Sequence, residues 1–197
     1  MAYDSGGKGD GSFNDAAYAG LVKAQQQLGV EIKELAAVAN DTDDLRLERL
    51  RLLASNGCNP VIAAGMVYST AIATAAKEFH GTTFAIIDAE VPGPNVASLV
   101  FAAEQGSYLA GVIAASASKT GKIGFIGGMD IPLINAFKAG YVQGAKSVNP
   151  NIMVETAYLG AAGDAAAWNS PEIAKSITEM MITNSVDVGY AVAGASN

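Results

Sequence analysis

Short apolar runs alternate with helical periodicity from one end of the chain to the other. The segments 61–64 and 83–88 are apolar over most of their length, while the segment 14–28 repeats apolar residues every three or four positions. Strands buried on both faces appear as nearly continuous apolar runs, and helices connect parallel neighbours in such sheets. The alternation therefore predicts an α/β fold, in which parallel, Rossmann-like sheets are covered by helices on both faces.

The expected elements follow one another in a regular order. We expect helices over 14–28, 42–56, 69–79, 103–119, 133–148 and 171–184, and strands over 31–38, 61–64, 83–88, 96–101, 123–127, 153–159 and 186–193. A polar turn at 119–122 separates two series of elements, so we place a boundary near Ser118, between one domain at 1–118 and a second at 119–197. Because the last strand is not followed by its helix, we expect the second domain to be truncated and the chain to be part of a longer protein.

Two local patterns add detail to this fold. The helix expected over 103–119 is rich in small residues, so we expect it to pack unusually closely on its neighbour. Ser12 and Asp15 have the S-x-x-D spacing of a capping box, in which each side chain binds the backbone N–H of the other residue. This spacing predicts a helix start at Asn14.

Composition excludes several classes of protein. Hydrophobic residues make up 50% of the chain and charged residues 16%, which excludes disorder. The net charge of −7 argues against a nucleic-acid partner, because phosphate binding needs clustered Lys and Arg. Cys58 is the single cysteine, so the sequence holds no internal disulfide and no cysteine-rich metal site. The longest apolar run is far too short to span a bilayer.

The loop SGGKGDGSFND, Ser5 to Asp15, is the first candidate binding segment. Its glycines allow positive φ and close approach to a ligand, although an ordinary flexible turn has the same composition. In open parallel sheets ligands bind beyond the carboxyl ends of the strands, and this loop follows the first strand. Ser12, Phe13 and Asn14 are its candidate ligand contacts.

A second segment, WNSP at 168–171, repeats the pattern of SFND at 12–15. Each places an aromatic residue and then an asparagine at the start of a helix that follows a strand. Phe13 and Trp168 are therefore candidates to clamp a flat ring, while Asn14 and Asn169 bind its edge. The alternative is that both aromatic rings are hydrophobic staples at helix starts, and the spacing alone does not separate the two interpretations.

Two aspartates complete the candidate site. Asp88 ends the apolar strand FAIID, and its carboxylate suits a ribose hydroxyl or a ring N–H; a helix cap or turn partner is the alternative. Asp130 follows the strand KIGFI at the same expected edge of a sheet. The glycine loop lacks the order of a phosphate-binding motif, so phosphate binding is weakly supported.

Catalysis finds little support in the residues. The one histidine, His80, lies in the polar turn EFHGTT, and no nucleophile has a neighbouring base in the sequence. No paired histidines or cysteines have metal-ligand spacing. We therefore expect a binding protein rather than an enzyme, with no cofactor and no metal.

Four stretches together resemble a known family. GGKGDGSFND, FAIID, EQGSYLAG and KTGKIGFIGGMDIPLINAFKAGYVQGAK are similar to segments of the basic membrane protein family of substrate-binding lipoproteins, in family order. Well-known members are purine nucleoside receptors of ABC transporters. The resemblance extends over essentially the whole chain.

The resemblance implies a two-lobed periplasmic-binding-protein fold of type I, truncated in the second lobe. It implies an extracytoplasmic transport protein that is attached to the cell membrane through a lipidated cysteine outside this sequence and that passes a nucleoside to an ABC permease. The ligand is expected in the cleft between the lobes, with purine nucleosides favoured. By the same resemblance Phe13 and Asn14 contact the base and Asp88 lines the site, while Trp168 stands where many relatives have phenylalanine. The family's ribose ligands, an Asp and a Lys, would lie beyond Asn197.

Two other functions stay open at this point. The chain is alternatively the ligand-sensing domain of a signalling or regulatory protein. It is otherwise an enzyme acting on nucleosides or sugars, for which Asp10, Asp15, Asp88 and Asp130 are the candidate acids or bases. The residues do not separate a nucleoside from a sugar or another small heterocycle.

Overall fold

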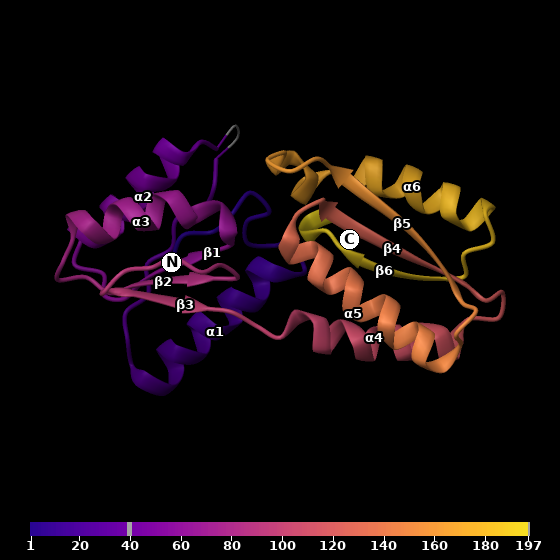
Figure 1. The fold of residues 1–197 in the computed structure, drawn as a ribbon. Coiled ribbons are helices and arrows are strands. Elements are labelled where there is room, and N and C mark those ends of the chain that lie inside the picture. Colours follow the sequence, from indigo (N-terminus) through magenta and orange to yellow (C-terminus); the bar gives the residue numbers. More distant parts are fainter. Residues whose placement is uncertain (39–40, 197) are drawn as a thin grey trace. The chain divides into compact units, whose positions relative to one another are not determined.

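The computed structural model describes residues 1–38 and 41–196, and it contains two compact units (Figure 1). The first unit is Met1–Phe101 and the second is Ala102–Asn197. Each unit holds a three-stranded parallel sheet with helices on both faces, as the alternation of apolar runs predicted.

The sheet of the first unit has the order β1 (Val61–Ala64), β2 (Phe84–Ile87), β3 (Val96–Leu99). Helix α1 (Phe13–Leu28) lies on one face, while α2 (Asp43–Ser55) and α3 (Ser69–Glu78) lie on the other (Figure 1). A short 3-10 helix, η1 (Met66–Tyr68), links β1 to α3.

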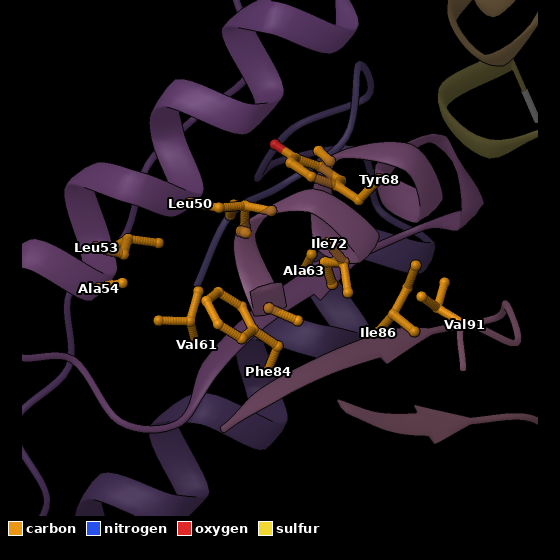
Figure 2. Packing of buried hydrophobic residues seen from close by; sticks show 14 residues of the cluster. Leu50, Leu53, Ala54, Val61, Ala63, Tyr68, Ile72, Phe84, Ile86 and Val91 are labelled. Carbon is orange, nitrogen blue, oxygen red and sulfur yellow. The ribbon is translucent and has the colours of Figure 1, made fainter. Parts of the chain in front are cut away.

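The hydrophobic core of the first unit lies between its sheet and the helices α2 and α3 (Figure 2). Apolar side chains from the sheet, α2, α3 and η1 meet there and are almost fully buried; they include Leu50, Leu53, Val61, Ala63, Tyr68, Ile72, Phe84 and Ile86. Burial of such side chains supplies the main driving force for the unit's folding. It also fixes the carboxyl edge of the sheet, where the candidate site begins.

The strand predicted over 31–38 is wrong. Leu35 alone forms a bridge there, pairing in parallel with Ala2 through backbone bonds with Met1 and Tyr3. The half-buried positions of the segment include the charged Glu34, and the alternation of exposed and half-buried positions shifts by one at Leu35. The segment therefore has no continuous apolar face to hold against the sheet. It contributes one pairing at an edge instead of a strand.

The sheet of the second unit has the order β5 (Met153–Gly160), β4 (Lys122–Met129), β6 (Val188–Val192). Helices α4 (Ala103–Ala117) and α5 (Pro132–Val148) lie on one face and α6 (Pro171–Thr183) lies on the other (Figure 1). Two 3-10 helices, η2 (Ala165–Asn169) and η3 (Gly194–Ser196), follow β5 and β6.

The close packing expected of the small-residue helix is confirmed. A Cβ atom added at Gly111 of α4 would collide with the Tyr141 carbonyl of α5, and one at Gly144 of α5 would collide with the Tyr108 carbonyl of α4. The two backbones therefore pack directly on each other, and α4 belongs to the second unit. The division of the chain falls after Phe101 and not near Ser118, because the polar turn at 119–122 only joins α4 to β4.

None of the helices in the described part of the chain is both long and apolar enough to cross a membrane.

Candidate ligand-binding site

Three chain segments bring their ends to one edge of the first unit's sheet. Ala2 pairs in parallel with Ala63 of β1, which in turn pairs in parallel with β2. The paired positions are Ala2, Ala63 and, in β2, Ile86. Two residues beyond each of them lie Asp4, Gly65 and Asp88, respectively. This is the carboxyl edge of the sheet, where open α/β folds bind their ligands.

Gly65 separates the two aspartates at this edge. Its φ of 96° is one that residues with a side chain rarely adopt. A Cβ atom at Gly65 would lie 3.0 Å from Oδ2 of Asp4, so the glycine leaves room for that carboxylate.

Asp10 organises the loop that leads into α1. One carboxylate oxygen accepts from the backbone N–H of Ser12 at 2.9 Å and of Asp15 at 3.1 Å, and the other accepts from that of Asn14 at 3.0 Å. Burial acts to raise the pKa of the Asp10 carboxyl, but these hydrogen bonds outweigh it and lower the pKa. Asp10 thus binds backbone N–H groups at the start of the helix, which the sequence pattern had assigned to Ser12 and Asp15.

The carboxylate of Asp15 binds the loop and not Ser12. It accepts from the backbone N–H of Gly9 at 2.7 Å and from that of Gly11 at 2.9 Å. The predicted capping box is therefore wrong, because the Ser12 N–H donates to Asp10. Asp15 instead holds the glycine turn against the first turn of α1.

Asn14 is buried, with 1% of its surface exposed, and its amide links the strand end to the loop. Its Nδ2 donates to Oδ1 of Asp4 at 2.6 Å and to Oδ2 of Asp10 at 2.9 Å. Its Oδ1 accepts from the backbone N–H of Asp4 at 3.3 Å. Both amide hydrogens are used within the loop, and direct contact of this amide with a ligand stays a prediction.

Asp4 is a further candidate residue at this edge, one that the sequence pattern missed. Its Oδ1 accepts from Asn14 and from the backbone N–H of Gly6 at 3.1 Å, and its side chain is half-buried. Burial raises the pKa of the Asp4 carboxyl above its usual value. The available signal was its place directly after the apolar start of the chain, at the end of the first strand-like segment.

Phe13 and Ser12 lie where the sequence places them. Phe13 is the first residue of α1 and Ser12 precedes it at the N-cap position, and both are half-buried. The helix start projects from the same loop that carries Asp10, beyond the carboxyl edge of the sheet.

Asp88 lies directly after β2 in a left-handed backbone conformation, with φ of 68°. Its backbone N–H donates to the Leu99 carbonyl at 2.9 Å. Its half-buried carboxylate has no hydrogen-bond or ionic partner within residues 1–38 and 41–196, and burial raises its pKa. Strained backbone conformations and groups with shifted pKa values cluster at functional sites.

In the second unit Trp168 lies in η2 and is half-buried. A Cβ atom at Gly128, near the end of β4, would collide with its indole ring, so the ring packs directly on that backbone. Asn169 is exposed beside it. Trp168 therefore lies at the carboxyl edge of the second sheet.

Asp130 lies at the same edge, one residue after β4, and is exposed. It accepts from Nδ2 of Asn135 at 2.8 Å, and Oδ1 of Asn135 accepts from the Tyr158 hydroxyl at 2.6 Å. The expected residues thus form one group in each unit. That Phe13 and Trp168 contact the same ligand stays a prediction.

Chemistry other than binding has few groups to work with. His80 is exposed in the turn after α3. Across the described ranges, no three histidine, cysteine, aspartate or glutamate side chains are grouped so that they could hold a metal ion.

Solved structures of known proteins share this fold. A solute-binding protein of an ABC transporter system from Aeropyrum pernix K1 superposes with a TM-score of 0.85 and 28% identity, over 99% of this chain and 54% of that chain. A transcriptional activator of the comK gene from Bacillus halodurans superposes with a TM-score of 0.75 and 25% identity, over 99% of this chain and 62% of that chain. The predicted fold of periplasmic-binding-protein type is confirmed.

Curated relatives are similar over nearly the whole chain. The ABC transporter nucleoside-binding protein BmpA of Lactococcus lactis subsp. cremoris is 36% identical over 198 residues, which cover 97% of this chain and 53% of the relative. Basic membrane protein A of Borreliella burgdorferi is 32% identical over 189 residues, 94% of this chain and 53% of the relative. The chain thus spans about half the length of these relatives.

The family described as ABC transporter substrate-binding protein PnrA-like matches residues 1–197. The match covers both units and the motifs on which the resemblance rested. The chain therefore belongs to the PnrA-like family of ABC transporter substrate-binding proteins.

Proposed function

We propose that this chain is part of a substrate-binding protein that binds a nucleoside and delivers it to an ABC permease. The observation that carries the proposal is Asp88, which lies at the carboxyl edge of the first unit's sheet with a positive φ. Its half-buried carboxylate has no partner in the described part of the chain. Such a group suits a neutral ligand that donates hydrogen bonds. A relative that is 36% identical is described as nucleoside-binding, which supports the same ligand class.

Each proposed contact has a stated role. Phe13 stacks on the flat base, Ser12 offers its hydroxyl beside it, and Asp88 accepts from a ring N–H or a ribose hydroxyl. Trp168 and Asp130 are the contacts contributed by the second unit. Asn14 also acts indirectly, because its amide holds Asp4 and Asp10.

Membership of the family supports a location and a partner for this protein. We place the protein outside the cytoplasm, attached to the cell membrane through a lipidated cysteine outside the present residues. Its partner is an ABC permease, and it moves its ligand without changing it. Incubation with inosine followed by chromatography should release no hypoxanthine or ribose.

Calorimetric titration of a chain of the relatives' full length tests the ligand class. Inosine, guanosine and adenosine should bind one to one, while cytidine and ribose should bind more weakly or not at all. Binding of ribose with no response to any nucleoside would replace the proposal with a sugar receptor. Silence across the panel would contradict it altogether.

Phe13→Ala isolates the stacking contact. The change should weaken inosine binding by about 1–3 kcal/mol, the scale of base–aromatic stacking. Phe79→Ala is the matched control, because Phe79 directly follows α3 and packs against the core of the first unit. It should lower stability and leave affinity unchanged. Equal affinity of Phe13→Ala and the unsubstituted protein would remove Phe13 from the site.

A regulatory function is the second candidate. It is favoured by the likeness to the Bacillus halodurans structure, which is described as a transcriptional activator. A DNA-binding segment in the full-length chain would support it, and nucleoside uptake that depends on this protein would contradict it.

A further inference from the structure

A buried polar network in the first unit ends at the root of the ligand-binding loop. Asp41 accepts from both terminal nitrogens of Arg49 at 2.6 Å, and Nε of Arg49 donates to the Tyr68 hydroxyl at 2.9 Å. The Tyr68 hydroxyl in turn donates to the Tyr3 backbone carbonyl at 2.8 Å. The chain of contacts therefore runs from helix α2 through η1 to the residue before Asp4.

The members of this network are withdrawn from solvent. Tyr68 is fully buried within the core cluster (Figure 2), 9% of Arg49 is exposed, and 4% of the Asp41 side chain is exposed. Arg46 also lies 3.0 Å from Asp41. Buried ion pairs contribute little to stability compared with apolar residues of the same volume. Stability alone therefore does not account for charges at this position.

What the network holds is the start of the loop. Asp4 follows Tyr3 directly, and its carboxylate fixes the Gly6 N–H and the Asn14 amide. The side chain of Tyr3 is anchored as well, because its hydroxyl donates to Glu34 at 2.5 Å, and Glu34 also pairs with Lys8 of the loop at 3.1 Å. With its carbonyl and its hydroxyl both held, Tyr3 has little freedom to rotate and sets the direction of Asp4.

We propose that Arg49 and Tyr68 are positioning residues for ligand binding, which hold the Tyr3 carbonyl so that Asp4 and the loop 5–14 stay in their binding geometry. The expected effect on affinity rests on the proposed function. The expected effect on the loop does not rest on the proposed function, because the hydrogen bonds of the loop form without a ligand.

Tyr68→Phe is the sharpest variant, since it removes only the hydroxyl that joins Arg49 to Tyr3. Arg49 keeps its paired Asp41, so the fold is not left with an isolated buried charge. Arg51→Met is a control for ion pairs outside the network, because Arg51 lies on the same helix as Arg49 but its pair with Glu78 is exposed. Ile72→Val is the stability control, because Ile72 is fully buried in the same core and is not part of the network.

The readouts are amide hydrogen exchange without ligand and inosine affinity. Exchange reports local opening, so a positioning role predicts at least fivefold faster exchange at Gly6 and Asn14 in Tyr68→Phe, with the α3 amides unchanged. Inosine should bind at least fivefold more weakly. Both controls should leave loop exchange and affinity within twofold of the unsubstituted protein.

Each outcome decides one of the two claims. Unchanged loop exchange in Tyr68→Phe overturns the inference whatever the protein binds. Faster exchange with unchanged inosine affinity also overturns it, because the loop geometry would then not matter for binding. Faster exchange in a protein that binds no nucleoside supports the positioning of the loop and overturns the proposed function.

Discussion

Asp88 carries two costs in the folded protein that no described neighbour offsets. Its backbone has a φ of 68°, and its half-buried carboxylate is unpaired within the described ranges. A left-handed conformation costs residues with a side chain about 1–2 kcal/mol, although aspartate adopts it more readily than most. Ligand hydroxyl or N–H groups would satisfy the carboxylate, so the proposed function accounts for the unpaired group.

Asp88→Gly should separate stability from function. Glycine adopts positive φ freely, so the free energy of unfolding should rise by about 1 kcal/mol. Inosine affinity should fall by about 1.5–3 kcal/mol, the scale of a hydrogen bond to a charged group. Urea unfolding and calorimetry measure the two effects.

Ser185→Gly is the control for this prediction. Ser185 has a φ of 70° in the turn between α6 and β6. The substitution should stabilise the protein to a similar extent and leave affinity unchanged. An Asp88→Gly variant that binds inosine as tightly as the unsubstituted protein would contradict the assignment of Asp88.

At the scale of single elements, the packing of α4 on α5 depends on residues without side chains. A Cβ atom at Gly144 would collide with the Tyr108 carbonyl, and backbone cannot move aside as a flexible side chain can. Gly144→Ala should therefore lower the free energy of unfolding by about 3 kcal/mol, at the upper end of overpacking costs.

Gly106→Ala on α4 is its counterpart. A Cβ atom there meets nothing within 4 Å, so the better helix propensity of alanine should raise stability by about 0.5–1 kcal/mol. Denaturant unfolding of both variants tests the pair. Equal effects of the two substitutions would show that the helices are not in backbone contact.

The turn before β4 depends on the Asp187 carboxylate. It accepts from the Ser118 hydroxyl at 2.7 Å and from the backbone N–H groups of Lys119 at 2.6 Å and Thr120 at 3.0 Å. These hydrogen bonds, that of Ser118 foremost, lower the pKa of Asp187 to about 2.

This lowered pKa gives a pH dependence with a definite sign. The stabilising contribution is complete above the usual pKa of 3.8 and is lost as the pH falls through about 2. Asp187→Asn should therefore flatten the loss of stability across that range. Urea unfolding at several pH values between about 2 and 3.8 measures the free energy of unfolding of both proteins. If that free energy depends on pH in the same way for Asp187→Asn and for the unsubstituted protein, the role of the carboxylate is contradicted.

Periodicity predicted most elements, and the errors lie where contacts with other segments determine the local structure. Apolar runs such as 61–64 and 83–88 gave strands, because burial on both faces is visible in the sequence itself. The segment 31–38 depended on an edge that pairs only at Leu35. The helix start depended on Asp10, two residues before the expected cap, and a spacing pattern cannot tell which carboxylate reaches the backbone.

The candidate site divides in the same way. The positions of Phe13, Asp88 and Trp168 at sheet edges follow from the order of strands, which the sequence pattern contains. The burial of Asn14 and the role of Asp4 do not, because both depend on side-chain directions within the folded loop.

For the whole molecule, charge restricts the ligand. The net charge is −7, and the carboxylates of Asp4, Asp10 and Asp88 lie at or beside the carboxyl edge of the first unit's sheet. Like charges brought together at a binding site cost several kcal/mol. A neutral nucleoside avoids this repulsion, whereas the negatively charged phosphate of a nucleotide is repelled by these carboxylates.

The most direct test of this account is a calorimetric comparison of inosine with inosine 5′-monophosphate on the full-length protein. We predict one-to-one binding of inosine and at least about tenfold weaker binding of the monophosphate, equivalent to about 1.4 kcal/mol. The difference should narrow as salt screens the carboxylates. Absence of inosine binding, or equal or tighter binding of the monophosphate, would contradict the claim that these units bind a neutral nucleoside.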